Sequence, residues 1–101
     1  MHDRGYECFD WDAGNIGKNL KSHNVSDQEA EEAFWNVPFY DYDALTHHGP
    51  EKRRIVLAKT NAGRTLFIAY TERGKCVRVI SARDMHKVER KVYYETVQGN
   101  S

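Results

Sequence analysis

The first quarter of the chain has a pattern of apolar positions that predicts one strand and one helix. The segment 6–11 is rich in aromatic residues, which favours a short strand. Apolar positions then recur at helical spacing and predict a helix over 15–23. We expect it to end at Asn24, because asparagine tolerates the left-handed conformation that closes many helices. The positions expected on one face of this helix are Ile16, Leu20 and His23.

A second helix is predicted over 27–35. Ser26 and Glu29 have the spacing of a capping box, in which each side chain bonds the other residue's backbone N–H. Between this helix and Pro50 the pattern weakens, and we expect a short extended segment followed by a mobile loop. The apolar side of the helix is expected to consist of Ala30, Ala33, Phe34 and Val37.

Three runs of strand-forming residues follow, over 55–58, 65–71 and 76–81. Short polar turns at 60–64 and 72–75 separate them. Strands joined by such short turns pair with their neighbours in antiparallel fashion. The pattern therefore predicts a three-stranded β-meander.

The last element is predicted to be a helix over 83–96. Ser81 and Asp84 have the spacing of a helix cap, and apolar positions again recur every three or four residues. The apolar side is expected to be formed by Met85, Val88, Val92 and Thr96.

Together these elements predict an α+β fold, in which two N-terminal helices and one C-terminal helix pack on a small antiparallel sheet. With 101 residues the chain can bury one core but not two, so we expect a single domain over 1–101. The ends, 1–5 and 98–101, are expected to be frayed.

The charge balance changes this picture, because it hides an asymmetry. The chain has 15 basic and 15 acidic residues, but residues 1–50 carry three Lys or Arg against ten Asp or Glu. Residues 51–101 carry twelve against five. A basic half is typical of proteins that bind phosphates, and equally of an ordinary solvated face.

Several classes are disfavoured by what the sequence lacks. No apolar run approaches the length of a membrane helix and the start does not resemble a signal peptide, so we expect a cytoplasmic protein without membrane contact. Cys8 and Cys76 are too few for a disulfide framework and are expected to be buried thiols. His47 and His48 lack metal-ligand spacing, so neither a metal nor another cofactor is expected.

The most reactive combination is expected at the ends of the meander strands. Glu72 and Arg73 end one strand, and Arg83 follows the next. A carboxylate beside guanidinium groups suits RNA cleavage, in which a base deprotonates the ribose 2′-hydroxyl and cations stabilise the phosphorane. The reaction also needs a further proton donor or acceptor, for which the candidates are His23, His86 and Tyr94.

Several of these segments together resemble the BrnT toxin family. The resemblance extends from Phe9 to Tyr93 and keeps the family's segment order. Its most specific part is Ile-Ser-Ala-Arg-Asp-Met at 80–85, followed by Glu-Arg-x-x-Tyr at 89–93. The other matching segments are Phe9–Asp12, Asn19–Leu20, His23–Ser26, Glu29–Ala30 and Thr71–Gly74.

The resemblance implies a RelE-like fold and a metal-independent ribonuclease toxin of a type II toxin–antitoxin pair, inhibiting translation and growth. At matching positions it assigns catalysis to Glu72, Arg73, Arg83 and His23. RNA binding is expected from Lys18, Lys21, Lys75, Arg78, Lys87, Arg90, Lys91 and Tyr94.

The implied partners are RNA, including ribosome-associated mRNA, and a BrnA-type antitoxin, with operator DNA bound only through the antitoxin complex. The chain departs from the family at Ser22-His23-Asn24, where many members have Lys-His-Gly, and at Asn15, where a basic residue is common. Lys18 or Lys21 is expected to supply that charge. A non-catalytic module that binds protein or RNA on the same fold is the alternative.

Overall fold

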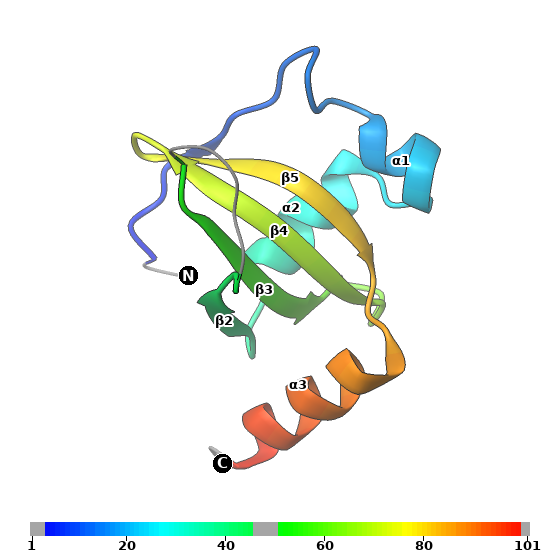
Figure 1. Cartoon of the computed structure of the whole chain (residues 1–101). Helices are drawn as coiled ribbons and strands as arrows, with labels where there is room; N and C mark the ends of the chain where they lie inside the picture. The colour runs from blue at the N-terminus through cyan, green and yellow to red at the C-terminus, as the bar shows by residue number, and fades with distance from the viewer. Residues whose placement is uncertain (1–3, 46–50, 100–101) are drawn as a thin grey trace.

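The computed structural model describes residues 4–45 and 51–99, which form a five-stranded sheet and three helices. Figure 1 shows α1 and α2 on one side of the sheet and α3 beyond the ends of the strands. We call the side against α2 the covered face and the opposite side the open face. The elements are β1 (Cys8–Phe9), α1 (Lys18–His23), α2 (Asp27–Trp35), β2 (Tyr40–Asp43), β3 (Arg53–Lys59), β4 (Thr65–Arg73), β5 (Cys76–Asp84) and α3 (Lys87–Gly99).

The predicted α+β class is confirmed, but the sheet is mixed rather than purely antiparallel. Its order is β1-β5-β4-β3-β2. The strands β3, β4 and β5 pair antiparallel through short turns as expected, and β2 adds to them in the same manner. β1 instead lies parallel to β5. These two strands are not joined by a short turn, because α1, α2 and the strands β2 to β4 lie between them in the chain.

The expectation of buried thiols was wrong. Cys8 and Cys76 form a disulfide between directly paired positions of β1 and β5, with their Cα atoms 4.5 Å apart. Cys8 is exposed. The 68-residue separation of the two cysteines concealed a contact that depends on the parallel pairing. By loop closure alone, such a link stabilises a fold by about 4 kcal/mol.

The covered face holds the larger core, and α2 has the predicted bounds. The capping box is confirmed, since the Ser26 hydroxyl accepts from the Glu29 N–H and the Glu29 carboxylate accepts from the Ser26 N–H, both at 3.0 Å. The helix packs its small residues and one phenylalanine against β3 and β4. The buried members of this core are Val25, Ala30, Ala33, Phe34, Val56, Ala58, Leu66, Ile68, Tyr70, Val77, Val79 and Ala82.

The helix α1 is shorter than predicted and presents the opposite side to the sheet. Ile16 and Leu20, expected to pack, are 58% and 53% exposed. Asn15 and Asn19 are buried instead, because their amides satisfy backbone groups at the sheet edge. The Asn19 side chain accepts from the Ala82 N–H at 3.0 Å. Asn24 ends the helix in the left-handed conformation, as predicted.

The last helix also begins later than expected. β5 continues through Ser81 to Asp84, so these residues pair with β4 and do not cap a helix. The Glu89 carboxylate accepts from the His86 N–H at 2.7 Å at the true helix start. Val88 faces solvent and is 73% exposed, whereas Tyr93 is buried. The side of α3 that packs against the second core therefore contains Tyr93 and Val97 in place of Val88 and Val92.

The helix α3 covers only part of the open face. It packs near β2 and β3, where Ile55, Leu57, Met85 and Tyr93 form a second, smaller core. At the ends of the described chain, the Arg4 guanidinium donates to the Phe34 carbonyl oxygen and α3 runs to Gly99. The other residues of the ends expected to be frayed, 1–3 and 100–101, lie outside the described residues. Within residues 4–45 and 51–99, no helix is long and apolar enough to span a membrane.

Candidate functional site

The end of β4 sends two neighbouring candidate residues to opposite sides of the sheet. Side chains alternate along a strand, so Glu72 lies on the covered face with Tyr70, and Arg73 lies on the open face with Thr71. Their adjacency in the sequence predicts that Glu72 and Arg73 act together in one catalytic site. The structure places them in two different hollows.

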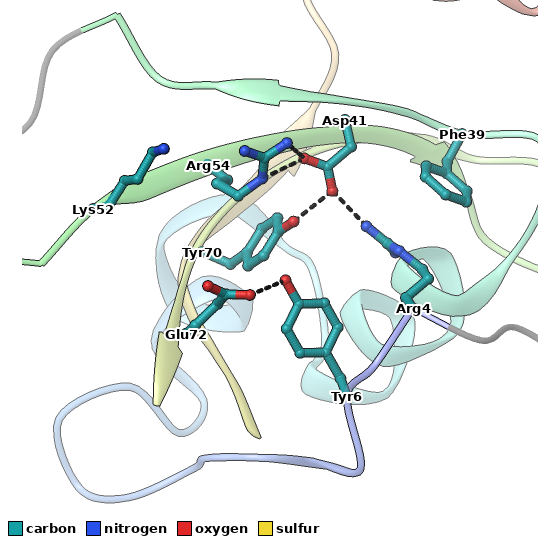
Figure 2. A pocket seen from close by; sticks show the side chains of 8 residues that line it. All are labelled: Arg4, Tyr6, Phe39, Asp41, Lys52, Arg54, Tyr70 and Glu72. Atoms are coloured by element: carbon teal, nitrogen blue, oxygen red, sulfur yellow. Dashed lines mark hydrogen bonds and ion pairs between the residues drawn. The ribbon is translucent and has the colours of Figure 1, made fainter. Parts of the chain in front are cut away.

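On the covered face, Asp41 is the centre of a polar network (Figure 2). Its carboxylate accepts from the Arg54 Nε at 2.8 Å, from Arg4 and from the Tyr70 hydroxyl. Asp41 and Arg4 keep only 14% and 10% of their side-chain surfaces exposed. Burial, followed by the hydrogen bond to Asp41, raises the pKa of Tyr70 far above its ordinary value, so this hydroxyl remains a donor.

Glu72 faces the same hollow, where it accepts from the Tyr6 hydroxyl at 2.6 Å (Figure 2). Burial and then the bond to Glu72 raise the pKa of Tyr6. Most charges of this hollow are therefore paired within the network. Its volume is about 330 Å³, and its lining consists of Arg4, Tyr6, Phe39, Asp41, Lys52, Arg54, Tyr70 and Glu72.

On the open face, a second hollow of about 240 Å³ is lined by four cationic side chains from four elements, α1, β3, β4 and β5. We call it the cationic hollow. Arg53 begins β3, Arg73 ends β4 and Arg78 lies near the start of β5, while Lys18 approaches from α1. The remaining lining residues are Gly14, Asn15, Glu51, Thr71, Val79 and Ile80.

Two of the cations are held by carboxylates. Arg73 bonds Glu51, with Nη2 and Oε1 2.9 Å apart, and this bond lowers the pKa of Glu51 and raises that of Arg73. Arg78 bonds both carboxylate oxygens of Asp12, at 3.0 and 3.1 Å, and so lowers the pKa of Asp12. Asp10 lies between the two arginines, 3.7 Å from Arg73 and 3.6 Å from Arg78.

The other two cations, Lys18 and Arg53, have no ion-pair partner within the part of the chain that the structure describes. Asn15 positions the loop that leads to Lys18. Its amide nitrogen donates to the carbonyl oxygens of Asp10, at 2.9 Å, and Val79, at 3.2 Å. Lys18 and Lys21 are the two lysines expected to supply the charge that the family commonly has at position 15. Of these two, Lys18 lines the hollow and Lys21 does not.

Next to the cationic hollow lies an apolar one of about 330 Å³, which we call the aromatic hollow. Arg53 belongs to both hollows, so they adjoin each other on the open face. Among the described residues that line the aromatic hollow there is no carboxylate. The lining consists of Tyr42, Ala44, Leu45, Arg53, Ile55, Phe67 and Ala69.

Arg83 lies on the open face at the far end of β5, where it pairs with Phe67 across the strands. Phe67 and Arg73 are six positions apart on β4, a distance of about 20 Å along a strand. The Arg83 guanidinium lies 3.8 Å from the centre of the Phe67 ring and bonds Glu89 at 2.8 and 2.9 Å. Although burial opposes it, these bonds and the His86 N–H lower the pKa of Glu89.

His23 is also far from Arg73. It is exposed at the end of α1, beside Asn24, whose carbonyl oxygen accepts from Arg64 at 2.8 Å. Arg64 in turn bonds Asp84 at the end of β5. The structure therefore does not bring His23 together with Glu72 or Arg73.

The predicted RNA-binding residues are dispersed over the surface. Lys75, in the turn between β4 and β5, pairs with Glu7 at 3.3 Å. Lys21, Lys87 and Lys91 are exposed on helices, while Arg90 donates to the Met85 carbonyl oxygen at 2.7 Å. Tyr94 packs beneath the Lys59 ammonium group. Lys18 and Arg78 alone of the eight line the cationic hollow.

Sequence reasoning missed Glu51, Arg53 and the two N-terminal aspartates of this site. The signal for Arg53 was present, because a basic residue precedes the apolar run of β3 and faces Thr71 across the hairpin. Asp10 and Asp12 could not be found this way, because their position depends on the parallel pairing of β1. The described residues contain no group of three or more His, Cys, Asp or Glu that could hold a metal, and His47 and His48 lie outside them.

An α+β chain with a cationic hollow on an open sheet face belongs to the broad class of proteins equipped to bind phosphate groups. The family model of the ribonuclease toxin BrnT, of type II toxin–antitoxin systems, matches residues 11–89. The chain therefore belongs to the BrnT family, as its motifs indicate. No curated protein matches it. Membership of the family brings with it an RNA substrate and an antitoxin protein partner.

Proposed function

We propose that the chain is an endoribonuclease whose site is the cationic hollow. The observation that carries this proposal is the convergence of Lys18, Arg53, Arg73 and Arg78 on an open sheet face, in a chain of a ribonuclease toxin family. The reaction is cleavage without a metal. The ribose 2′-hydroxyl gives its proton to a base as its oxygen attacks the adjacent phosphorus. The bond to the 5′-oxygen breaks and that oxygen takes a proton from water, so the products carry a 2′,3′-cyclic phosphate and a 5′-hydroxyl.

Arg73 and Arg78 bind the phosphate and stabilise the additional negative charge of the phosphorane, since guanidinium groups match phosphate oxygens in pairs. Arg53 and Lys18 hold the neighbouring backbone. Glu51 is the proposed base, because its carboxylate lies against Arg73, which holds the phosphate in this proposal.

The resemblance also assigns catalysis to Glu72, Arg83 and His23, and these assignments stay predictions. Our proposal gives them no contact with the phosphate, because Glu72 lies on the covered face and the other two lie at the far ends of the strands. The RelE-like fold implied by the resemblance is likewise a prediction that supports the proposal.

In the cell we propose that the enzyme cleaves mRNA in the cytoplasm and thereby inhibits translation, until a BrnA-type antitoxin binds it. Operator DNA is then bound through the antitoxin complex. A disulfide is unusual in the reducing cytoplasm. Activity is therefore to be measured with and without a reductant.

The test is induced expression in a bacterial host of the wild type and of Arg73→Ala/Arg78→Ala. The matched control is Lys52→Ala/Lys59→Ala, which removes the same number of charges outside the cationic hollow. We expect growth arrest and new 5′-hydroxyl RNA ends with the wild type and the control, and neither with the Arg73/Arg78 variant.

Two outcomes would contradict the proposal. If the folded wild type leaves growth and RNA ends unchanged, the chain is a non-catalytic binding module. If the Arg73/Arg78 variant remains as toxic as the wild type, the site lies elsewhere. Thermal unfolding of each purified variant separates loss of activity from loss of fold.

A further inference from the structure

The open face offers more than a place for a phosphate, because its two hollows meet at Arg53. Thr71 lines the cationic hollow, and Ala69 lines the aromatic hollow on the same face of β4. Two residues of a strand span about 7 Å. The two hollows are therefore as close together as the phosphate and the base of one nucleotide.

The lining of the aromatic hollow suits a flat, apolar ring system. Tyr42 and Phe67 supply aromatic rings, and Leu45 is 99% exposed at its rim. The volume of about 330 Å³ exceeds that of a nucleobase. Among the described lining residues Arg53 alone is charged, and its guanidinium can bond a base edge or the backbone.

The position of Arg83 supports this interpretation. Its guanidinium stacks on Phe67 and is fixed by two bonds to Glu89, so the ring is held from one side. A ring that is already held loses little conformational freedom when a base stacks on it. Arg83 thus acts through Phe67 as a positioning residue in this arrangement.

We propose that the aromatic hollow binds an unpaired nucleobase of the RNA strand whose phosphate occupies the cationic hollow. This inference rests on the proposed function and deepens it, because it defines the substrate class. A base within a duplex is stacked and paired and cannot enter the hollow. The substrate is therefore single-stranded RNA, and the hollow adds base recognition to sequence-independent backbone binding.

The experiment measures binding and cleavage of one short RNA as a single strand, as a duplex, and as single strands with one abasic ribose placed at each position in turn. We expect cleavage of the single strand, little cleavage of the duplex, and loss of cleavage when the abasic ribose lies next to the scissile phosphate. The protein variants are Tyr42→Ala, Leu45→Ser and Arg73→Ala. The matched control is Val88→Ser, which changes an exposed apolar residue on α3.

We expect Tyr42→Ala to weaken single-strand binding about tenfold, since one base–aromatic stack is lost. Leu45→Ser, at a fully exposed position, tests the same hollow without risk to the fold and should weaken binding by less. Neither variant should change the salt dependence of binding, whereas Arg73→Ala should reduce it, because Arg73 contacts phosphate in the proposed site and Tyr42 and Leu45 do not.

The inference and the proposed function fail differently. Equal binding of single strand and duplex, with no effect of Tyr42→Ala or of an abasic position, would overturn the base site and leave the cationic hollow in place. Absence of any RNA binding or cleavage by the wild type would overturn both. If Tyr42→Ala leaves RNA binding intact but abolishes binding of the antitoxin, the hollow docks a protein side chain instead, and the inference is wrong.

Discussion

The two faces of the sheet end in polar hollows of opposite character, although they share the strands β3 and β4. On the covered face, Asp41 is 14% exposed and is surrounded by Arg4, Arg54 and Tyr70. On the open face, Arg73 and its partner Glu51 are 44% and 42% exposed. The Asp41–Arg4 centre of the first network is largely buried, whereas the Arg73–Glu51 pair lies within reach of a ligand.

This difference in exposure determines whether a network contributes to stability or to ligand binding. A largely buried network strongly penalises the loss of any member, because the partners left behind stay desolvated. An exposed ion pair contributes about 0–1 kcal/mol and is easily exchanged for another partner. The covered face therefore holds the fold together, and the open face has cations that a phosphate can take over.

The largest expected effect concerns Arg73 and its neighbour in sequence, Glu72. Arg73→Ala should reduce the rate of RNA cleavage by about 100-fold or more, the usual consequence of removing one preorganised group that stabilises charge in a transition state. Glu72→Gln should change the rate little, because Glu72 faces the other hollow. Single-turnover cleavage of a labelled RNA by each purified variant measures both rates.

A large rate loss in Glu72→Gln with an unchanged unfolding temperature would contradict the assignment of the covered face to structure and the open face to catalysis. It would show that the covered hollow takes part in the chemistry, as the family resemblance implies. Equal losses in both variants would indicate a site that spans the sheet edge.

The next effect should appear in stability and on the covered face. Asp41→Asn leaves Arg4 without its carboxylate and Arg54 with Asp43 alone, and should lower the free energy of unfolding by about 2–3 kcal/mol. Urea denaturation followed by circular dichroism measures this change. Below its unfolding transition the variant should cleave RNA at the wild-type rate, so a selective loss of activity would contradict the assignment of Asp41 to structure.

The sequence predicted the elements that depend on local signals. The capping box at Ser26 and Glu29 set the start of α2, and the polar turns fixed the pairing of β3, β4 and β5. It failed where a distant partner decides which side of an element is buried. Asn15 and Asn19 face the sheet because unpaired backbone groups of β5 need their amides, and no local pattern shows that need.

The site was predictable only in part for a related reason. Arg73 and Arg78 were predicted as functional cations from the sequence. Glu51 and Arg53 lie before the predicted strand 55–58 and become neighbours of Arg73 only through the hairpin register. Adjacency in the chain suggested Glu72 as the partner of Arg73. Strand alternation separates that pair and brings Glu51 to Arg73 instead.

A smaller effect is expected for Glu51, which has two proposed roles on the open face. In the free protein its carboxylate competes with phosphate for Arg73, and it is also the proposed base. Glu51→Gln should therefore bind RNA a few-fold more tightly at neutral pH and yet turn it over more slowly. Parallel changes in binding and turnover would contradict these two roles.

The pH dependence of binding tests the same point. Arg73 lowers the pKa of Glu51 below its usual range, so the wild-type carboxylate stays charged and competes with phosphate throughout the range from pH 7 to pH 5. As the pH falls through the lowered pKa, the carboxylate is protonated and the competition ends. Wild-type affinity, measured by fluorescence anisotropy, should then rise toward that of Glu51→Gln, while the gap between the two stays constant from pH 7 to pH 5. A gap that closes already at pH 6 would show that another group controls access to Arg73.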